Sequence, residues 1–326
     1  MRKGGKAAEV ETNAQAARLD AASEPATADE VPTDDAAPVP APDPGKPARA
    51  PRRRVSRRTL GSSEPLSSPT TKVPGARSRQ RVAVVIPAKD ESRRIAATVR
   101  SARAIPHVDL VLVVDDGSED NTQHVAREAG AVVVRHSHNR GKAAAMETGA
   151  AVVAMRDAPD RLPRLLLFID GDLGETAVNT APLVPPVLEG TADVSIALLP
   201  PQPGAGGRGI VVGAARRAIA AMTGWTPTQP LSGMRCLTRE AFEAATPLAR
   251  GWGVETGMTI DLLRQGFVAV EVPCDLRHRP SGADLKGQLH RAAQYRDVQL
   301  AVNARRVRRV AGAIRSTVNP PRGSTD

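Results

Sequence analysis

Carboxylate and lysine side chains stand at the ends of short apolar stretches of this sequence. Asp115 and Asp116 follow residues 110–114, and Asp170-Gly171-Asp172 follows residues 165–169. Two carboxylates separated by one glycine can turn toward one hard divalent cation such as Mg²⁺ or Mn²⁺, which prefers oxygen ligands. Such a cation neutralises a diphosphate leaving group. Lys142 follows a glycine at a predicted helix start, where phosphate groups bind readily. The pattern predicts a site for a metal and a phosphorylated, polyhydroxylated ligand.

Each of these features also has a simpler interpretation when it is taken alone. Asp and Gly are common in turns, so the tripeptide by itself is more typical of a turn than of a metal site. A single lysine such as Lys142 is more often a solvated surface residue. The interpretation as a ligand site depends on the strand ends that these residues share.

The surrounding pattern predicts a parallel sheet that places these residues together. Four apolar, β-branched runs alternate with three segments of helical period; the runs are residues 82–86, 110–114, 131–134 and 165–169, and the segments are 91–103, 120–128 and 142–155. This alternation indicates βαβ units, whose ligands bind beyond the carboxyl ends of the strands. Asp120, with Gln123 three residues later, predicts a capping box at the second helix.

Beyond residue 190 the alternation is less regular. A fifth strand is predicted over residues 193–199, followed by a Gly- and Pro-rich loop over 200–209 that is a candidate lid. Helices are predicted over 210–222 and 254–265, a strand over 267–272, and an amphipathic helix from residue 285 to about residue 314.

The net charge of +10 is unevenly distributed along the chain. Residues 1–80 are Ala/Pro-rich and predicted to be disordered, and the charge of 51–81 is +8. Residues 81–283 are predicted to form the globular domain, which is close to neutral, 284–317 a basic amphipathic C-terminal helix, and 318–326 a tail. The basic ends raise the hypothesis of peripheral contact with anionic lipid, with a solvated tail and a packed helix as the alternative.

Composition excludes several classes of protein. The chain has two Trp, one Tyr and three Phe, too few for the aromatic platforms that bind single-stranded nucleic acid, so no nucleic-acid partner is expected. Its two Cys form neither a disulfide scaffold nor a four-ligand zinc site, which favours a reducing compartment. No apolar run is long enough to span a membrane. We therefore expect a cytoplasmic protein, with peripheral contact at the inner membrane face and a homodimer left open.

Four motifs together resemble family 2 glycosyltransferases, enzymes of the GT-A fold that use nucleotide-diphosphate sugars. They are IPAKDE, VDDGSEDNT, NRGKAAAMETG and IDGDL, beginning at Ile86, Val114, Asn139 and Ile169. The resemblance implies a nucleotide-sugar site and a DxD metal site; the nucleotide-sugar residues are Pro87, Ala88, Asp90, Glu91, Asp115, Asp116, Lys142 and Asp170, and the metal ligands are Asp170 and Asp172.

The second half of the chain resembles the glucosyl-3-phosphoglycerate synthase and polyprenyl-phosphate sugar transferase branches of that family. PLSGMR, beginning at Pro230, is similar to their acceptor loop, and GWGVETG, beginning at Gly251, to the next segment. The resemblance implies acceptor contacts from Ser232, Gly233, Arg235 and Glu255. Glu255, Asp172 and Arg235 are its candidate catalytic residues, and His278 would be a third metal ligand. Two departures are Lys89, where a neutral residue is usual, and the lack of a QxxRW signature, which argues against a processive synthase.

These observations together lead to one expected activity. The expected enzyme moves a sugar from a nucleotide-diphosphate donor, UDP favoured and GDP open, to a phosphorylated small molecule or polyprenyl phosphate, with Mg²⁺ or Mn²⁺. Inversion or retention of configuration is left open, and Glu255 is the candidate base for inversion. The alternative is a catalytically silent GT-A domain that acts as a basic interaction module. A nucleotidyltransferase or a NAD-binding fold would require a glycine-rich loop after the first strand, where this sequence instead has IPAKDE.

Overall fold

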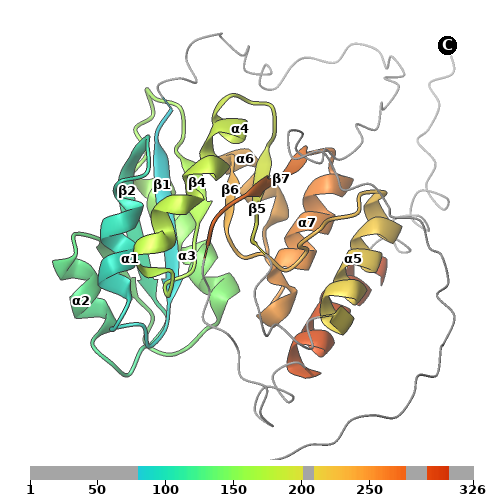
Figure 1. Ribbon diagram of the computed structural model, residues 1–326, viewed down its shortest axis with the longest axis horizontal. Coiled ribbons are helices and arrows are strands. Elements are labelled where there is room, and N and C mark those ends of the chain that lie inside the picture. Colours follow the sequence, from blue (N-terminus) through green and yellow to red (C-terminus); the bar gives the residue numbers. More distant parts are fainter. Residues whose placement is uncertain (1–79, 201–208, 277–291, 308–326) are drawn as a thin grey trace, which may run out of the picture. The chain divides into compact units, whose positions relative to one another are not determined.

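The computed structural model describes residues 80–200, 209–276 and 292–307 (Figure 1). The chain divides into two units, residues 1–45 and 46–326, and every described residue belongs to the second. The proposed lid over 200–209, His278 and the predicted boundaries at 283 and 317 fall wholly or mostly outside the described residues. Within the described part of the chain, no helix is long and apolar enough to cross a membrane.

Among the described residues, seven strands form one sheet in the order β3-β2-β1-β4-β6-β5-β7. The strands are β1 (Val82–Ala88), β2 (Val108–Asp115), β3 (Val132–Arg135), β4 (Leu165–Phe168), β5 (Val194–Leu198), β6 (Arg235–Leu237) and β7 (Ala269–Pro273). All neighbours pair in parallel except β6, which is antiparallel to both β4 and β5. The other six strands therefore end at one edge of the sheet, and β6 begins there. The predicted α/β fold with a mostly parallel sheet is confirmed.

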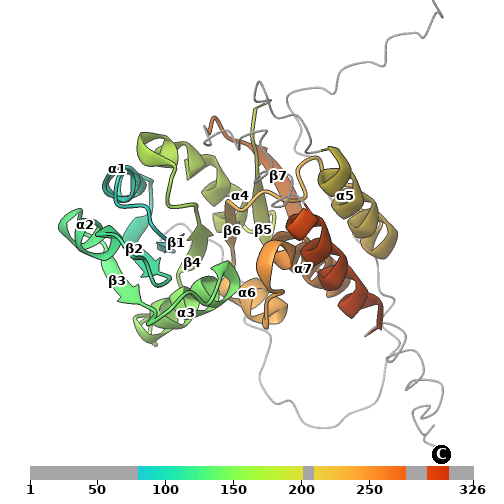
Figure 2. The same ribbon diagram turned by 90° about the horizontal axis from the view of Figure 1, so that it is seen from below.

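Helices cover both faces of the sheet (Figure 2). They are α1 (Ile95–Ala102), α2 (Thr122–Glu128), α3 (Lys142–Met155), α4 (Val184–Leu188), α5 (Gly209–Thr223), α6 (Arg239–Ala245) and α7 (Val254–Arg264), with 3₁₀ turns η2 (Gly174–Leu183) and η3 (Gly251–Gly253). Ala83 and Val85 of β1 face a core with α3, α5, α6 and α7. Val84 and Ile86 face a second core with α1, α2, η2 and α4. This alternation is what a strand buried on both faces requires.

Residues 292–307 are helical, as the amphipathic pattern predicts, and they pack on α7. Val298 and Val302 enter the first core. Arg305 is 4% exposed, and its Nε atom donates to Asp261 Oδ1 at 2.9 Å. The buried face of this helix therefore combines apolar packing with one ion pair.

Several details differ from the sequence-based expectations, among them the start of α2 and the strand β6. The helix α2 begins at Thr122, and its N-cap residue Asn121 makes no side-chain capping bond. The predicted capping box is wrong, because Asp120 instead accepts the amide N–H groups of Ser92 and Thr122. The strand β6 was not predicted, since three residues are too few to show an alternating pattern.

Candidate functional site

Lys142, Asp170 and Glu255 meet at the carboxyl edge of the sheet. Lys142 begins α3, Asp170 follows β4, and Glu255 lies in the first turn of α7. Lys142 Nζ is 2.9 Å from Asp170 Oδ1 and 3.1 Å from Glu255 Oε1. Of these side chains, Lys142 is 32% exposed, Asp170 29% and Glu255 10%. The cluster is thus half-buried and open to a ligand on one side.

The two carboxylates determine the charge of the lysine. Burial alone would lower the pKa of Lys142, but Asp170 and Glu255 outweigh it and raise that pKa above its usual value. The side chain is therefore an ammonium group throughout the physiological range. A fixed positive charge beside two carboxylates at a helix N-terminus suits the binding of phosphate oxygens.

The turn that follows β4 is fixed by α1. Thr98 Oγ1 donates to Gly171 O at 2.8 Å and accepts from Gly174 N at 2.8 Å. Arg94 Nη1 donates to Asp172 O at 3.1 Å. These bonds hold backbone atoms of Gly171, Asp172 and Gly174, and the side chains of Asp170 and Asp172 are partly exposed at the edge.

These aspartates are the candidate ligands of a divalent cation. Within the described ranges no three His, Cys, Asp or Glu residues gather into a metal-binding group. Two partly exposed carboxylates fit Mg²⁺ or Mn²⁺, since such cations commonly retain waters and bind phosphate oxygens beside one or two carboxylates. His278, the third predicted ligand, lies outside the described residues.

Asp116 holds the turn that leads to Lys142. Its Oδ1 accepts from Arg140 N at 2.8 Å, and its Oδ2 accepts from Gly141 N at 2.7 Å. His136 Nδ1 lies 2.7 Å from Asp116 Oδ1. The nucleoside contact that the resemblance implies for Asp116 stays a prediction. Sequence reasoning missed His136; its position directly after a strand was the available signal.

Asp115 is fully buried beside this turn. Its Oδ1 accepts from Ser118 N at 2.9 Å, and its Oδ2 lies 3.5 Å from Arg135 Nε. The turn at Gly117 packs closely against His138: a Cβ on Gly117 would lie 2.6 Å from the carbonyl carbon of His138. With φ at +72°, this position requires glycine.

The end of β1 and the loop after it carry the other predicted nucleotide-binding residues, Pro87, Ala88, Asp90 and Glu91. Ala88 O accepts from Asp116 N, and Glu91 N donates to Thr122 Oγ1. Asp90 pairs with Lys89 and accepts from Glu119 N at 2.8 Å. Lys89, unusual at its position, is thus the ionic partner of Asp90. The end of β1 lies beside the turn that contains Asp170: a Cβ on Gly171 would lie 3.3 Å from Ala88 Cβ.

The predicted acceptor residues lie on β6, on the loop before it and on α7. Gly233 adjoins Lys142, whereas Arg235 is 1% exposed. Arg235 Nε donates to Ser232 O and Nη1 donates to Thr259 Oγ1. Burial lowers the pKa of Arg235 to about 10, although Glu255 and Glu271 oppose this. Its guanidinium group is therefore buried and remains charged at neutral pH.

Several buried polar atoms of the described residues have no hydrogen-bond partner. Three of them belong to β6, the loop before it and α7: Arg235 Nη2, Ser232 Oγ and Thr256 Oγ1. A buried polar group without a partner is costly, so these atoms are candidates for bonding to water.

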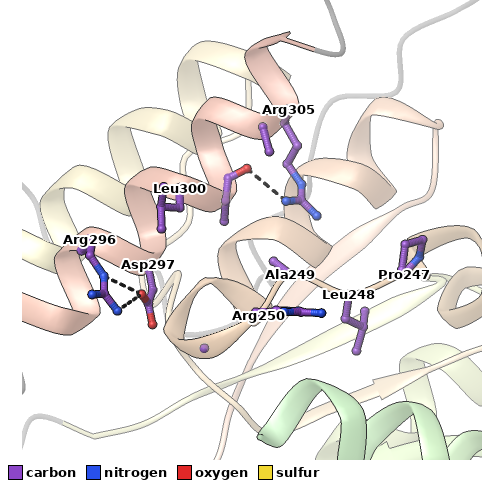
Figure 3. Close-up of a pocket in the computed structure, with 11 residues that line it drawn as sticks. Pro247, Leu248, Ala249, Arg250, Arg296, Asp297, Leu300 and Arg305 are labelled. Atoms are coloured by element: carbon purple, nitrogen blue, oxygen red, sulfur yellow. Dashed lines mark hydrogen bonds and ion pairs between the residues drawn. The ribbon is translucent and has the colours of Figure 1, made fainter. Parts of the chain in front are cut away.

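A groove of about 490 Å³ lies away from the cluster, between residues 247–251 and the helix 292–307 (Figure 3). Leu300 and the Arg296–Asp297 ion pair line one side, and Arg250 lines the other. None of the lining residues belongs to the predicted site.

Comparisons with known proteins agree with this arrangement. The family model for glycosyl transferase family 2 matches residues 83–214. The glycosyltransferase AglJ of Haloferax volcanii is 32% identical over 207 residues, which cover 62% of this chain and 65% of that protein. Glucosyl-3-phosphoglycerate synthase of Mycolicibacterium paratuberculosis is 29% identical over 212 residues, 60% of this chain and 64% of that protein. The chain thus spans just under two thirds of the length of these two relatives.

Solved structures show the same fold. Glucosyl-3-phosphoglycerate synthase from Mycobacterium tuberculosis, in complex with Mn²⁺, uridine diphosphate and phosphoglyceric acid, has a TM-score of 0.58 and 27% identity. The match covers 71% of this chain and 80% of that one. The fold is therefore of the GT-A type, and residues 83–214 match the family model for glycosyl transferase family 2.

Proposed function

We propose that the protein transfers a sugar from a nucleotide-diphosphate donor to a phosphorylated acceptor. The observation that carries this proposal is the meeting of Lys142, Asp170 and Glu255 beside the N-terminus of α3. A UDP-sugar is the favoured donor, since a relative of known structure, glucosyl-3-phosphoglycerate synthase from Mycobacterium tuberculosis, was solved with uridine diphosphate. Glucosyl-3-phosphoglycerate synthase, similar over most of this chain, was also solved with phosphoglyceric acid.

In this mechanism Lys142 and the start of α3 hold the donor diphosphate. The ammonium group and the first amide N–H groups of the helix offer positive charge where the leaving diphosphate gains negative charge. Asp170 and Asp172 would hold a divalent cation, which supplies further neutralisation of that charge when bound. Asp170 also keeps the lysine at the edge of the sheet, since Lys142 Nζ is 2.9 Å from its carboxylate.

The acceptor is proposed to approach from the side of Gly233 and Glu255. Glu255 is buried and lies against Lys142, so it is close to the point where sugar would leave the diphosphate. It is the candidate to contact the acceptor, and the base if configuration inverts. Contact of Arg235 with an acceptor phosphate stays a prediction, because its guanidinium group is buried in the described state.

Nucleotide release from a panel of UDP- and GDP-sugars tests this function. The rate would be measured with Mg²⁺ or Mn²⁺, with EDTA, and with 3-phosphoglycerate or a polyprenyl phosphate as acceptor. We expect metal-dependent turnover with one acceptor class, and its loss in Asp172→Asn. Asp160→Asn, at an exposed aspartate outside the site, is the matched control. Absence of both turnover and metal-dependent nucleotide binding would favour the silent GT-A domain instead.

Peripheral contact with an anionic membrane is the remaining part of the proposal. Trp252, Leu300 and Val307 are 43%, 61% and 67% exposed, and the arginines Arg250 and Arg296 are exposed near them. Apolar side chains flanked by arginines are typical of surfaces that bind anionic lipid, and each arginine near the surface contributes roughly 1 kcal/mol.

Co-sedimentation with vesicles tests this contact. Binding to phosphatidylglycerol vesicles should exceed binding to phosphatidylcholine vesicles and fall in the double variant Leu300→Glu/Val307→Glu. Met155→Glu is the control, since Met155 is 77% exposed on α3. Equal sedimentation of all three proteins would contradict the contact, whether or not the enzyme is active.

A further inference from the structure

His136 is a buried residue that uses both nitrogens of its ring. It is 6% exposed and lies directly after β3. Its Nδ1 lies 2.7 Å from Asp116 Oδ1, and its Nε2 lies 3.0 Å from Thr148 Oγ1. Thr148 belongs to α3, the helix that begins at Lys142. The imidazole therefore connects the end of one strand to the helix that carries the lysine.

The direction of these hydrogen bonds follows from the state of Asp116. Burial would raise the pKa of Asp116, but the N–H groups of Arg140, His136 and Gly141 outweigh it and lower that pKa. An ionised carboxylate only accepts hydrogen bonds, so Nδ1 of His136 must donate. In the neutral ring Nε2 then accepts from the hydroxyl group of Thr148.

Asp116 transmits this arrangement to the residues before Lys142. Its carboxylate accepts from Arg140 N and Gly141 N, at 2.8 and 2.7 Å. Gly141 has a φ of +88° and is the last residue before α3, so these two bonds determine where the helix begins. Without a donor at Nδ1, the carboxylate loses one of its three hydrogen-bond donors and can turn away from the amides.

We propose that His136 is a positioning residue for the donor diphosphate: its Nδ1–H orients Asp116, which holds the Arg140–Gly141 turn and thereby places Lys142. This role rests on the proposed function, in which Lys142 and the start of α3 bind the diphosphate. It extends the site by a residue that does not touch the substrate. His136 and Asp116 form a hydrogen-bonded dyad. The effect of this dyad on the Arg140–Gly141 turn is measurable even without turnover.

Substitution of His136 by Asn or by Gln tests its two hydrogen bonds one at a time. In His136→Asn the side-chain NH₂ stands near the position of Nδ1 and donates to Asp116, whereas in His136→Gln it stands near the position of Nε2. We expect Asn to keep the KM for the donor within about threefold of wild type. Gln and Ala should raise that KM on the order of tenfold or more with a smaller change in kcat, because Lys142 is then misplaced for binding the diphosphate. His124→Gln, at an exposed histidine of α2, is the control.

Equal KM values in the Asn, Gln and Ala variants, or a loss confined to kcat, would overturn the role. If the His136 variants do not fold, Thr148→Ser and Thr148→Val replace them: Ser keeps the hydroxyl group and should match wild type, and Val should raise the KM. Equal values in that pair would also overturn it.

Hydrogen exchange separates this inference from the proposed function. Exchange of the Arg140 and Gly141 amides should accelerate in His136→Ala and much less in His136→Asn, since both amides bond to Asp116. Accelerated exchange in a protein that transfers no sugar would reject the proposed function and leave the dyad intact. Unchanged exchange in His136→Ala would reject the dyad.

Discussion

The ammonium group of Lys142 occupies space that Gly233 leaves by having no side chain. A Cβ on Gly233 would lie 2.5 Å from Lys142 Nζ and 3.3 Å from Asp170 Oδ1. The loop before β6, the start of α3 and the turn after β4 therefore meet at one point. Since the antiparallel β6 begins at the edge where β4 ends, this approach depends on the direction of a three-residue strand.

Gly233→Ala should impair donor binding without unfolding the protein. The displaced atom is the end of a flexible side chain, so we expect the free energy of unfolding to change by less than about 1 kcal/mol. The lysine must leave its place beside Asp170, which should raise the KM for the donor on the order of tenfold. Urea unfolding and initial rates check the two expectations. A variant with wild-type KM would show that the lysine position is not required.

Removal of the lysine charge should have a larger effect. Lys142→Met leaves Asp170 and Glu255 without the cation between them and removes a charge beside the leaving diphosphate. We expect kcat to fall on the order of 100-fold, as for the loss of one charge-stabilising group. Nucleotide release measures this, and Arg127→Ala, at an exposed cation of α2, is the control. A change of less than threefold would exclude Lys142 from the proposed mechanism.

Asp120 gives a prediction of stability against pH. Burial would raise the pKa of Asp120, but bonds from Thr122 and Ser92 outweigh it and lower that pKa to about 2. The folded pKa lies below the usual value, so this stabilisation is present above about pH 4 and is lost as pH falls toward 2. Asp120→Asn should cost about 1 kcal/mol at pH 7, allowing for partial solvent screening. Urea unfolding from pH 7 to 2 measures it, and a difference that persists at pH 2 would contradict the prediction.

The sequence predicts Lys142 and Asp170 as neighbours because both lie at carboxyl ends of a parallel sheet. That edge follows from local patterns: apolar runs, helical periods and the residues after each run. The helix over residues 142–155 is confirmed to the residue. Glu255 enters only through the family resemblance, because nothing local links α7 to this edge.

Other contacts at the site depend on distances across the fold. The approach of Gly233 to Lys142 requires the antiparallel pairing of β6, and the bond from His136 to Thr148 requires β3 to lie against α3. Asp120 shows the same limit: its spacing to Gln123 fits a capping box, yet Ser92 offers a competing N–H from another loop. Local spacing contains no information about such competition.

The opposite edge of the sheet offers a prediction of stability alone. Arg164 is 8% exposed and directly precedes β4. Its Nε and Nη2 donate to Asp109 of β2 at 2.7 and 3.0 Å, and its Nη1 donates to Asp157 after α3 at 2.7 Å. Arg164→Met should lower the free energy of unfolding by about 1 to 2 kcal/mol, because both carboxylates lose their shared cation while Arg81 still pairs with Asp109 and Arg239 with Asp157.

Arg164 and the Lys142 cluster lie at opposite ends of β4, so the two should separate in experiment. At a temperature where Arg164→Met remains folded, its donor KM and kcat should equal those of wild type. Arg161→Ala, which removes an exposed arginine from the same loop, should change the free energy of unfolding by less than about 0.5 kcal/mol. A destabilisation no larger than this control would show that the Asp109–Arg164–Asp157 contacts do not support the fold. A raised donor KM in folded Arg164→Met would instead show that the two edges are coupled through β4.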